Sequence, residues 1–91
     1  MRTLTLALKA IYFDDIKAGR KLFEYRLDTP YWRKRLEGQI YDQVVLTKGY
    51  PRRDDASRRL TLPWRGCHLE SLTHEHFGPD PVVVFAINVK H

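Results

Sequence analysis

Residues 15–26 constrain the fold more than any other part of the chain. Gly19 is suited to end a helix, because a residue without a Cβ adopts left-handed backbone at little cost. The alternation after it predicts a strand with Tyr25 on one face and with Glu24 and Arg26 on the other. A carboxylate and a guanidinium are costly to bury on one strand face. The segment therefore predicts a helix end followed by a strand that borders a polar site.

The length and composition predict one globular domain over residues 1–91, since 91 residues with 43% hydrophobic content can bury a small core. Cys67 is the single cysteine, which excludes an internal disulfide and a multi-cysteine metal site and favours a reduced, cytoplasmic compartment. His74 and His76 lack the spacing of a zinc pair, so neither a metal nor a cofactor is expected. A signal peptide is not predicted, and no apolar run approaches the roughly 18 residues of a membrane span.

The basic residues indicate an anionic partner. Sixteen Lys and Arg stand against eleven Asp and Glu, a net charge of +5, and the arginines cluster in the middle third. The alternative is that the basic surface only keeps the protein soluble. The planar guanidinium of arginine matches the geometry of phosphate, however, so RNA or DNA is favoured as the partner. For Trp64, between a proline and an arginine, both core packing and base stacking stay open. The predicted nucleic-acid contacts are Lys9, Arg26, Lys48, Arg52, Arg53, Arg58, Arg59, Trp64 and Arg65.

The hydrophobic periodicity predicts short strands and two small helices. The first strand is expected to be half-buried, with its leucines on one face. Tyr12 is expected in the apolar stripe of the first helix, and Val83 on the same face of the last strand as Phe85, Ile87 and Val89. The strands are expected at 3–9, 22–27, 41–48, 60–62, 66–72 and 82–89, and the helices at 12–18 and 31–37. Thr29 is a plausible cap for the second helix, with Pro30 at its first position. Residues 52–60 are expected to form an exposed loop or one helical turn. The class is α+β, a small mixed β-barrel with a cleft at one mouth, in which only the first helical connection joins parallel neighbours.

A polar cleft is the most specific functional prediction. Lys9, Lys21, Glu24, Arg26 and Lys48 fall at strand ends or on one strand face, so they can converge. An amine beside Glu24 would act as a general base or bind a phosphate. Ordinary surface ion pairs are the alternative, as is a structural Glu24–Arg26 pair that fixes the strand to its neighbour. Tyr25 and Trp32 are interpreted as packing residues.

These residues carry a resemblance to a known family. The chain resembles the ASCH domain of the PUA-like superfamily over residues 4–89, with features of small stand-alone bacterial and phage members. The family pattern is a strand with a lysine, a helix, Gly-x-Lys and then Glu-x-Arg. In this chain the pattern matches Lys9, Gly19, Lys21, Glu24 and Arg26.

The resemblance implies a PUA-like β-barrel whose cleft binds RNA or a nucleotide. It also offers two hydrolase alternatives. Some small members are similar to amidohydrolases on N4-acetylcytidine, which have a lysine matching Lys21 but a threonine where this chain has Glu24. Others resemble metal-independent ribonucleases that use lysine, tyrosine and serine, types that Lys21, Tyr50 and Ser57 supply. The candidate catalytic residues are thus Lys21, Glu24, Tyr50 and Ser57. A third possibility is a protein-interaction module that meets an acidic surface of a partner.

Overall fold

The order of the elements follows the predicted one. A computed structural model describes the backbone of all 91 residues and every side chain except that of His76. The described chain contains β1 (Thr3–Leu8), α1 (Ala10–Lys17), β2 (Phe23–Leu27), α2 (Pro30–Leu36), β3 (Gln43–Lys48), the 3₁₀ turn η1 (Ala56–Arg58), β4 (Arg59–Pro63), β5 (Cys67–His74), the 3₁₀ turn η2 (Glu75–Phe77) and β6 (Gly78–Asn88).

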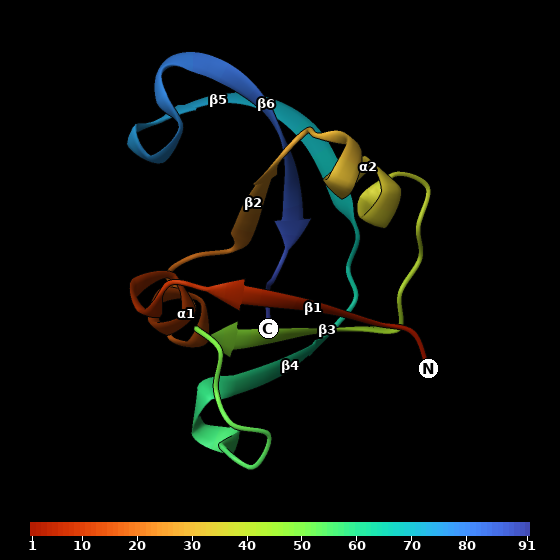
Figure 1. Cartoon of the computed structure of the whole chain (residues 1–91), viewed down its shortest axis with the longest axis vertical. Helices are drawn as coiled ribbons and strands as arrows, with labels where there is room; N and C mark the ends of the chain where they lie inside the picture. Colours follow the sequence, from red (N-terminus) through yellow and green to blue (C-terminus); the bar gives the residue numbers. More distant parts are fainter.

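The six strands form two separate sheets (Figure 1). One has the order β1-β3-β4 and the other the order β2-β6-β5, and α1 and α2 lie on opposite sides of the molecule. The predicted α+β class, with five or six strands and two short helices, is confirmed, and the described chain has six strands. A closed barrel is not detected in the described chain, because β1 and β2 each remain at the edge of a sheet.

The strand pairing differs from the prediction at one point. Apart from the parallel pair β1–β3, the pairs are antiparallel, and Leu4 lies opposite Val44 and Leu6 opposite Leu46 in that parallel pair. The expectation that the first helical connection joins parallel neighbours is wrong. α1 carries the chain from the first sheet to the second, and the crossover back to β3 also includes β2 and α2. This longer path supplies the return that parallel pairing needs.

The core lies between the two sheets and is closed by the helices. The alternating leucines of β1 are buried, as predicted, and so are the inward residues of β3 and β6. Val83 was expected on one face with Phe85, Ile87 and Val89, but it is 48% exposed whereas those three residues are buried. The β5–β6 hairpin extends beyond the first sheet at this end, so no opposing layer covers it (Figure 1). The core residues are Leu4, Leu6, Leu8, Phe13, Ile16, Leu36, Val44, Leu46, Leu62, Phe85, Ile87 and Val89.

The end of α1 is closed by glycine, as predicted. Gly19 has φ 79°, and its N–H donates to the carbonyl of Ile16 at 3.0 Å. The N–H of Arg20 reaches the carbonyl of Asp15 at 2.9 Å, which completes the two-bond pattern of a Schellman end. The N–H of Lys21 also donates to the carbonyl of Asp15, at 3.1 Å. These bonds fix the direction in which Lys21 leaves the helix.

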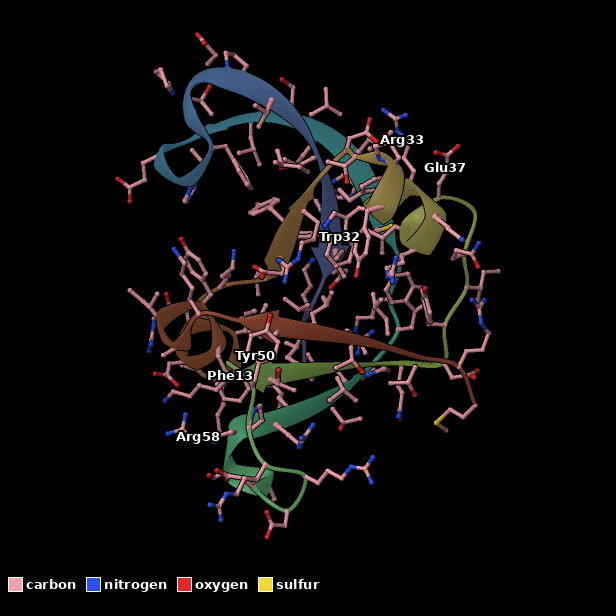
Figure 2. All side chains as sticks on the ribbon, viewed as in Figure 1. Phe13, Trp32, Arg33, Glu37, Tyr50 and Arg58 are labelled. Atoms are coloured by element: carbon pink, nitrogen blue, oxygen red, sulfur yellow. The ribbon has the colours of Figure 1, made fainter. Side chains whose placement is uncertain are left out.

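The start of α2 is capped by Thr29, also as predicted. Its hydroxyl oxygen accepts a hydrogen bond from the backbone N–H of Trp32 at 3.3 Å. Leu36 anchors the helix in the core. Figure 2 shows Trp32 on the side of α2 that faces β1, whereas Arg33 and Glu37 point away from it. The cap therefore sets which side chains of this short helix reach the space between the sheets.

Candidate functional site

A cavity of about 730 Å³ lies where the edges of β1 and β2 face each other. Its volume is in the range of small-molecule sites. Residues 5–9 and 24–27 form its two long sides. The remaining lining residues come from both helices, the connections on either side of β2, the β3–β4 connection and the tip of the β5–β6 hairpin: Tyr12, Lys21, Thr29, Tyr31, Trp32, Tyr50, His74 and Phe77. The cavity thus occupies the open edge between the two sheets.

A buried carboxylate lies in the wall of this cavity. Glu24 is 4% exposed and lies opposite Ile87 of β6, on the inner face of the second sheet. Its Oε2 accepts a hydrogen bond from Nη1 of Arg26 at 2.6 Å, and its Oε1 lies 3.6 Å from Nζ of Lys21. A carboxylate offers about four acceptor positions. Glu24 therefore keeps acceptor capacity for a ligand.

Arg26 joins the edges of the two sheets. Besides its bond to Glu24, its Nη1 donates to the carbonyl of Tyr25 at 2.9 Å, and its Nη2 donates to the carbonyl of Ala7 at 3.1 Å. Its guanidinium carbon also lies 5.3 Å from the centroid of the Trp32 ring. The guanidinium thus stands where strand-to-strand backbone bonds would run in a closed barrel. This geometry agrees with the interpretation of Glu24 and Arg26 as a structural pair that fixes β2 to its neighbour.

Lys21 is held between aromatic rings. Its ammonium nitrogen lies 4.7 Å from the centroid of the Tyr25 ring and 5.3 Å from that of Tyr12, and its side chain is about one-fifth exposed. Such cation–π contacts are worth about 0.5–2 kcal/mol depending on desolvation. Together with Glu24, the rings restrict the ammonium to one position in the cavity wall.

The aromatic lining is richer than the sequence indicated. Tyr25 and Trp32 were interpreted as packing residues; both are half-buried, but both also line the cavity. Tyr12 was placed only in the apolar stripe of its helix. Its position one helical turn after Lys9 was the available signal, because side chains three apart on a helix share a face. Sequence reasoning missed these residues because half-buried rings are compatible with both roles.

The surroundings of Tyr25 hold its phenol in the neutral form. Burial raises the pKa of Tyr25 above 10.0, and the negative charges of Glu70 and Glu24 raise it further. Because this pKa is raised on folding, the contribution of Tyr25 to the free energy of unfolding is fully present below pH 10.0. It is lost as the pH rises through the folded-state pKa. The Tyr25 hydroxyl therefore remains a hydrogen-bond donor throughout the neutral range.

We expect an alkaline titration to detect this shift. The difference in tyrosinate absorbance between the wild-type chain and Tyr25→Phe should give a midpoint for Tyr25 above 10.0. Glu70→Gln should lower that midpoint, because it removes one of the negative charges that disfavour the phenolate. A midpoint at or below 10.0 in the folded protein would contradict the described surroundings of this ring.

The arginine-rich β3–β4 connection lies apart from the cavity. Ser57 donates a hydrogen bond to Oδ1 of Asp55 at 2.6 Å, and Nε of Arg58 lies 3.3 Å from Oδ2 of the same carboxylate. Arg59 donates to the carbonyls of Pro51 and Arg52, at 3.5 and 3.2 Å. Apart from Tyr50, the predicted residues of this connection do not line the cavity: Arg52, Arg53, Ser57, Arg58 and Arg59. The structure therefore does not bring Lys21, Tyr50 and Ser57 together as the ribonuclease prediction required.

Three further predicted residues also lie elsewhere. Nζ of Lys48 lies 3.1 Å from Oδ1 of Asp14 on α1, so it does not join the other predicted lysines in the cavity lining. Trp64 is partly buried against the core, with its ring 5.1 Å from that of Tyr41, which favours packing. Arg65 donates to the backbone carbonyls of residues 90 and 91 at 3.3 and 3.5 Å. The predicted residues that do line the cavity are Lys9, Lys21, Glu24, Arg26 and Tyr50.

Within the described side chains, no group of three or more His, Cys, Asp and Glu residues is arranged to hold a metal ion. In the same part of the structure, the helices are too short or too polar to cross a membrane. Comparisons of the chain with protein-family models, with curated proteins and with solved structures find no match. The geometry of the cavity is therefore the basis for a functional proposal.

Proposed function

We propose that the chain is an ASCH-type domain of the PUA-like superfamily whose cavity binds a nucleotide. The observation that carries the proposal is the position of Glu24. It is a buried carboxylate between two cations, in the wall of a cavity lined by aromatic rings. Four of the five residues that carry the family resemblance line this cavity, and the fifth, Gly19, ends the helix in front of Lys21.

The charges of the lining match an anionic ligand that also donates hydrogen bonds. Three cationic side chains, Lys9, Lys21 and Arg26, line the cavity with one carboxylate, Glu24. The excess of positive charge favours a phosphate. The carboxylate adds an acceptor for an exocyclic amine, as glutamate does when it recognises a base edge. The tyrosine and tryptophan rings provide surfaces on which a flat base stacks. A nucleotide combines these three properties.

Hydrolysis in the same cavity is the second candidate, because the ammonium of Lys21 lies beside the carboxylate of Glu24. An amine and a carboxylate in contact can move a proton during a reaction. Binding is favoured over hydrolysis because Ser57, the nucleophile type in the ribonuclease prediction, lies outside the cavity. Recovery of the ligand after incubation with EDTA separates the two: intact nucleotide supports binding, and metal-independent cleavage supports the hydrolase.

The proposal is tested by titrating the protein with the four ribonucleoside monophosphates. The background is Trp64→Phe, which leaves Trp32 as the single tryptophan and makes its fluorescence report on the cavity. We expect saturable binding that weakens between low and moderate salt, because phosphate contacts release counterions. Isothermal titration calorimetry on the unmodified chain is the control for the substitution. The proposal would be contradicted if none of the four nucleotides binds, or if the affinity does not change with salt concentration.

A further inference from the structure

Two tyrosines at the border of the cavity leave much of their rings exposed. Tyr50 is 96% exposed and Tyr31 is 56% exposed, and both line the cavity. They come from different parts of the fold. Tyr50 follows β3 of the first sheet, whereas Tyr31 belongs to α2, which follows β2 of the second sheet. Neither ring belongs to the hydrophobic core, so each offers an aromatic surface to a partner.

The backbone beneath Tyr50 is held in place although the ring is exposed. The N–H of Gly49 donates to the carbonyl of Leu8 at 2.8 Å, and the hydroxyl of Thr47 donates to the carbonyl of Gly49 at 2.7 Å. Gly49 has φ 68°, which lets the chain turn sharply at the end of β3. Pro51 then restricts the backbone of Tyr50. Stacking of a ligand on this ring therefore has to order only the two side-chain torsions and not the backbone.

The Tyr31 ring is also held by its neighbours. The guanidinium carbon of Arg35 lies 3.7 Å from the centroid of the Tyr31 ring. The ring of Trp32 meets it edge to face, with centroids 5.0 Å apart and an angle of 81° between the planes. More than half of Tyr31 remains exposed with both contacts in place. Arg35 covers one face of the ring, and the exposed remainder of Tyr31 is the second ordered surface for stacking.

Exposed cations follow both tyrosines in the sequence. Arg52 and Arg53 follow Tyr50 on the β3–β4 connection, and Lys34 and Arg35 follow Tyr31 on α2. They are not among the lining residues, so a mononucleotide in the cavity would not need them. Phosphates on either side of a bound base would meet them.

We infer that the cavity takes an internal nucleotide of single-stranded RNA, with the neighbouring bases stacked on Tyr31 and Tyr50. The inference rests on the proposed function and specifies its ligand as a strand in place of a free nucleotide. Exposed rings beside cations are the arrangement by which single strands are held, because bases stack while phosphates pair. A duplex would hide the faces of its bases and would not use either tyrosine.

The test compares a single-stranded RNA pentanucleotide with the nucleoside monophosphate of its central base. We expect the pentanucleotide to bind at least about ten-fold more tightly, since stacking of one base contributes roughly five- to hundred-fold in affinity. Tyr31→Ala and Tyr50→Ala should each bring the ratio of the two affinities closer to one. Tyr31→Phe and Tyr50→Phe keep a stacking ring and should keep the ratio. Ile40→Ala, at an exposed position outside the cavity lining, is the matched control.

The outcomes separate the inference from the proposed function. Equal affinities for the mononucleotide and the pentanucleotide would overturn the inference and leave the proposed function intact. So would alanine variants that keep the wild-type ratio, or tighter binding of a duplex of the same sequence. Absence of binding by both ligands would contradict the proposed function itself. Circular dichroism of each variant confirms that the fold is retained, which is expected because both rings lie outside the core.

Discussion

Arg26→Ala is expected to lower the free energy of unfolding by roughly 3 kcal/mol, because it leaves the carboxylate of Glu24 buried without its closest partner. The side chains of this pair are only 18% and 5% exposed, so water can replace little of what is lost. The contact of Lys21 with Glu24 remains, which keeps the effect at the low end for a broken buried pair. The substitution also removes the hydrogen bond to Ala7 that joins the two sheets.

Urea denaturation of the variant measures this effect, and the corresponding fall in melting temperature is roughly 12–24 °C for a domain of this size. Arg20→Ala is the matched control. Its ion pair with Asp15 lies at the surface, with side chains 66% and 35% exposed, and should contribute less than about 1 kcal/mol. The double variant Glu24→Leu with Arg26→Met should recover much of the stability, since an apolar pair leaves no buried charge. Equal losses for Arg26→Ala and Arg20→Ala would show that the contact between the sheets is not structural.

Glu24→Gln is expected to weaken binding of nucleotides that carry an exocyclic amine by roughly ten- to hundred-fold, because hydrogen bonds to a charged group are worth about 1.5–3 kcal/mol. The glutamine keeps the size of the side chain and one acceptor oxygen but loses the charge. Uridine monophosphate has no exocyclic amine, so its affinity should change less. Titrations with cytidine and uridine monophosphates measure the difference.

Glu70→Gln is the control for this substitution, because Glu70 lies on β5 of the same sheet, with its side chain 37% exposed, and does not line the cavity. It should leave the preference for cytidine over uridine monophosphate as in the wild-type chain. If Glu24→Gln changes the two affinities equally, Glu24 supports the cavity wall and does not read the base. That result would also remove the observation on which the proposed function rests.

The local features of the fold were predictable because short-range bonds and periodicity determine them. Gly19 ends α1 and Thr29 caps α2 through contacts within a few residues, so the sequence around each is sufficient. The alternation in residues 3–8 predicted the buried leucines of β1 for the same reason. Lys21, Glu24 and Arg26 were predicted to share a site because strand and turn geometry bring neighbours in sequence together.

The parts that sequence could not decide depend on pairing between distant segments. Lys48 was grouped with the site but pairs with Asp14, since the packing of α1 against β3 decides which carboxylate it meets. Ser57 has the right residue type, but the course of the β3–β4 connection takes it away from the cavity. Trp32 was interpreted as packing, and only the placement of α2 makes it part of the lining.

The sequence by itself determined the class, the order of the elements and the charged corner from Gly19 to Arg26. These follow from residue periodicity and from hydrogen bonds that span a few residues. Only the tertiary structure decided that β1 pairs with β3 and that β1 and β2 remain as two facing edges joined by Arg26. Pairing of strands far apart in sequence depends on how whole faces bury against each other, and a local pattern does not contain that information.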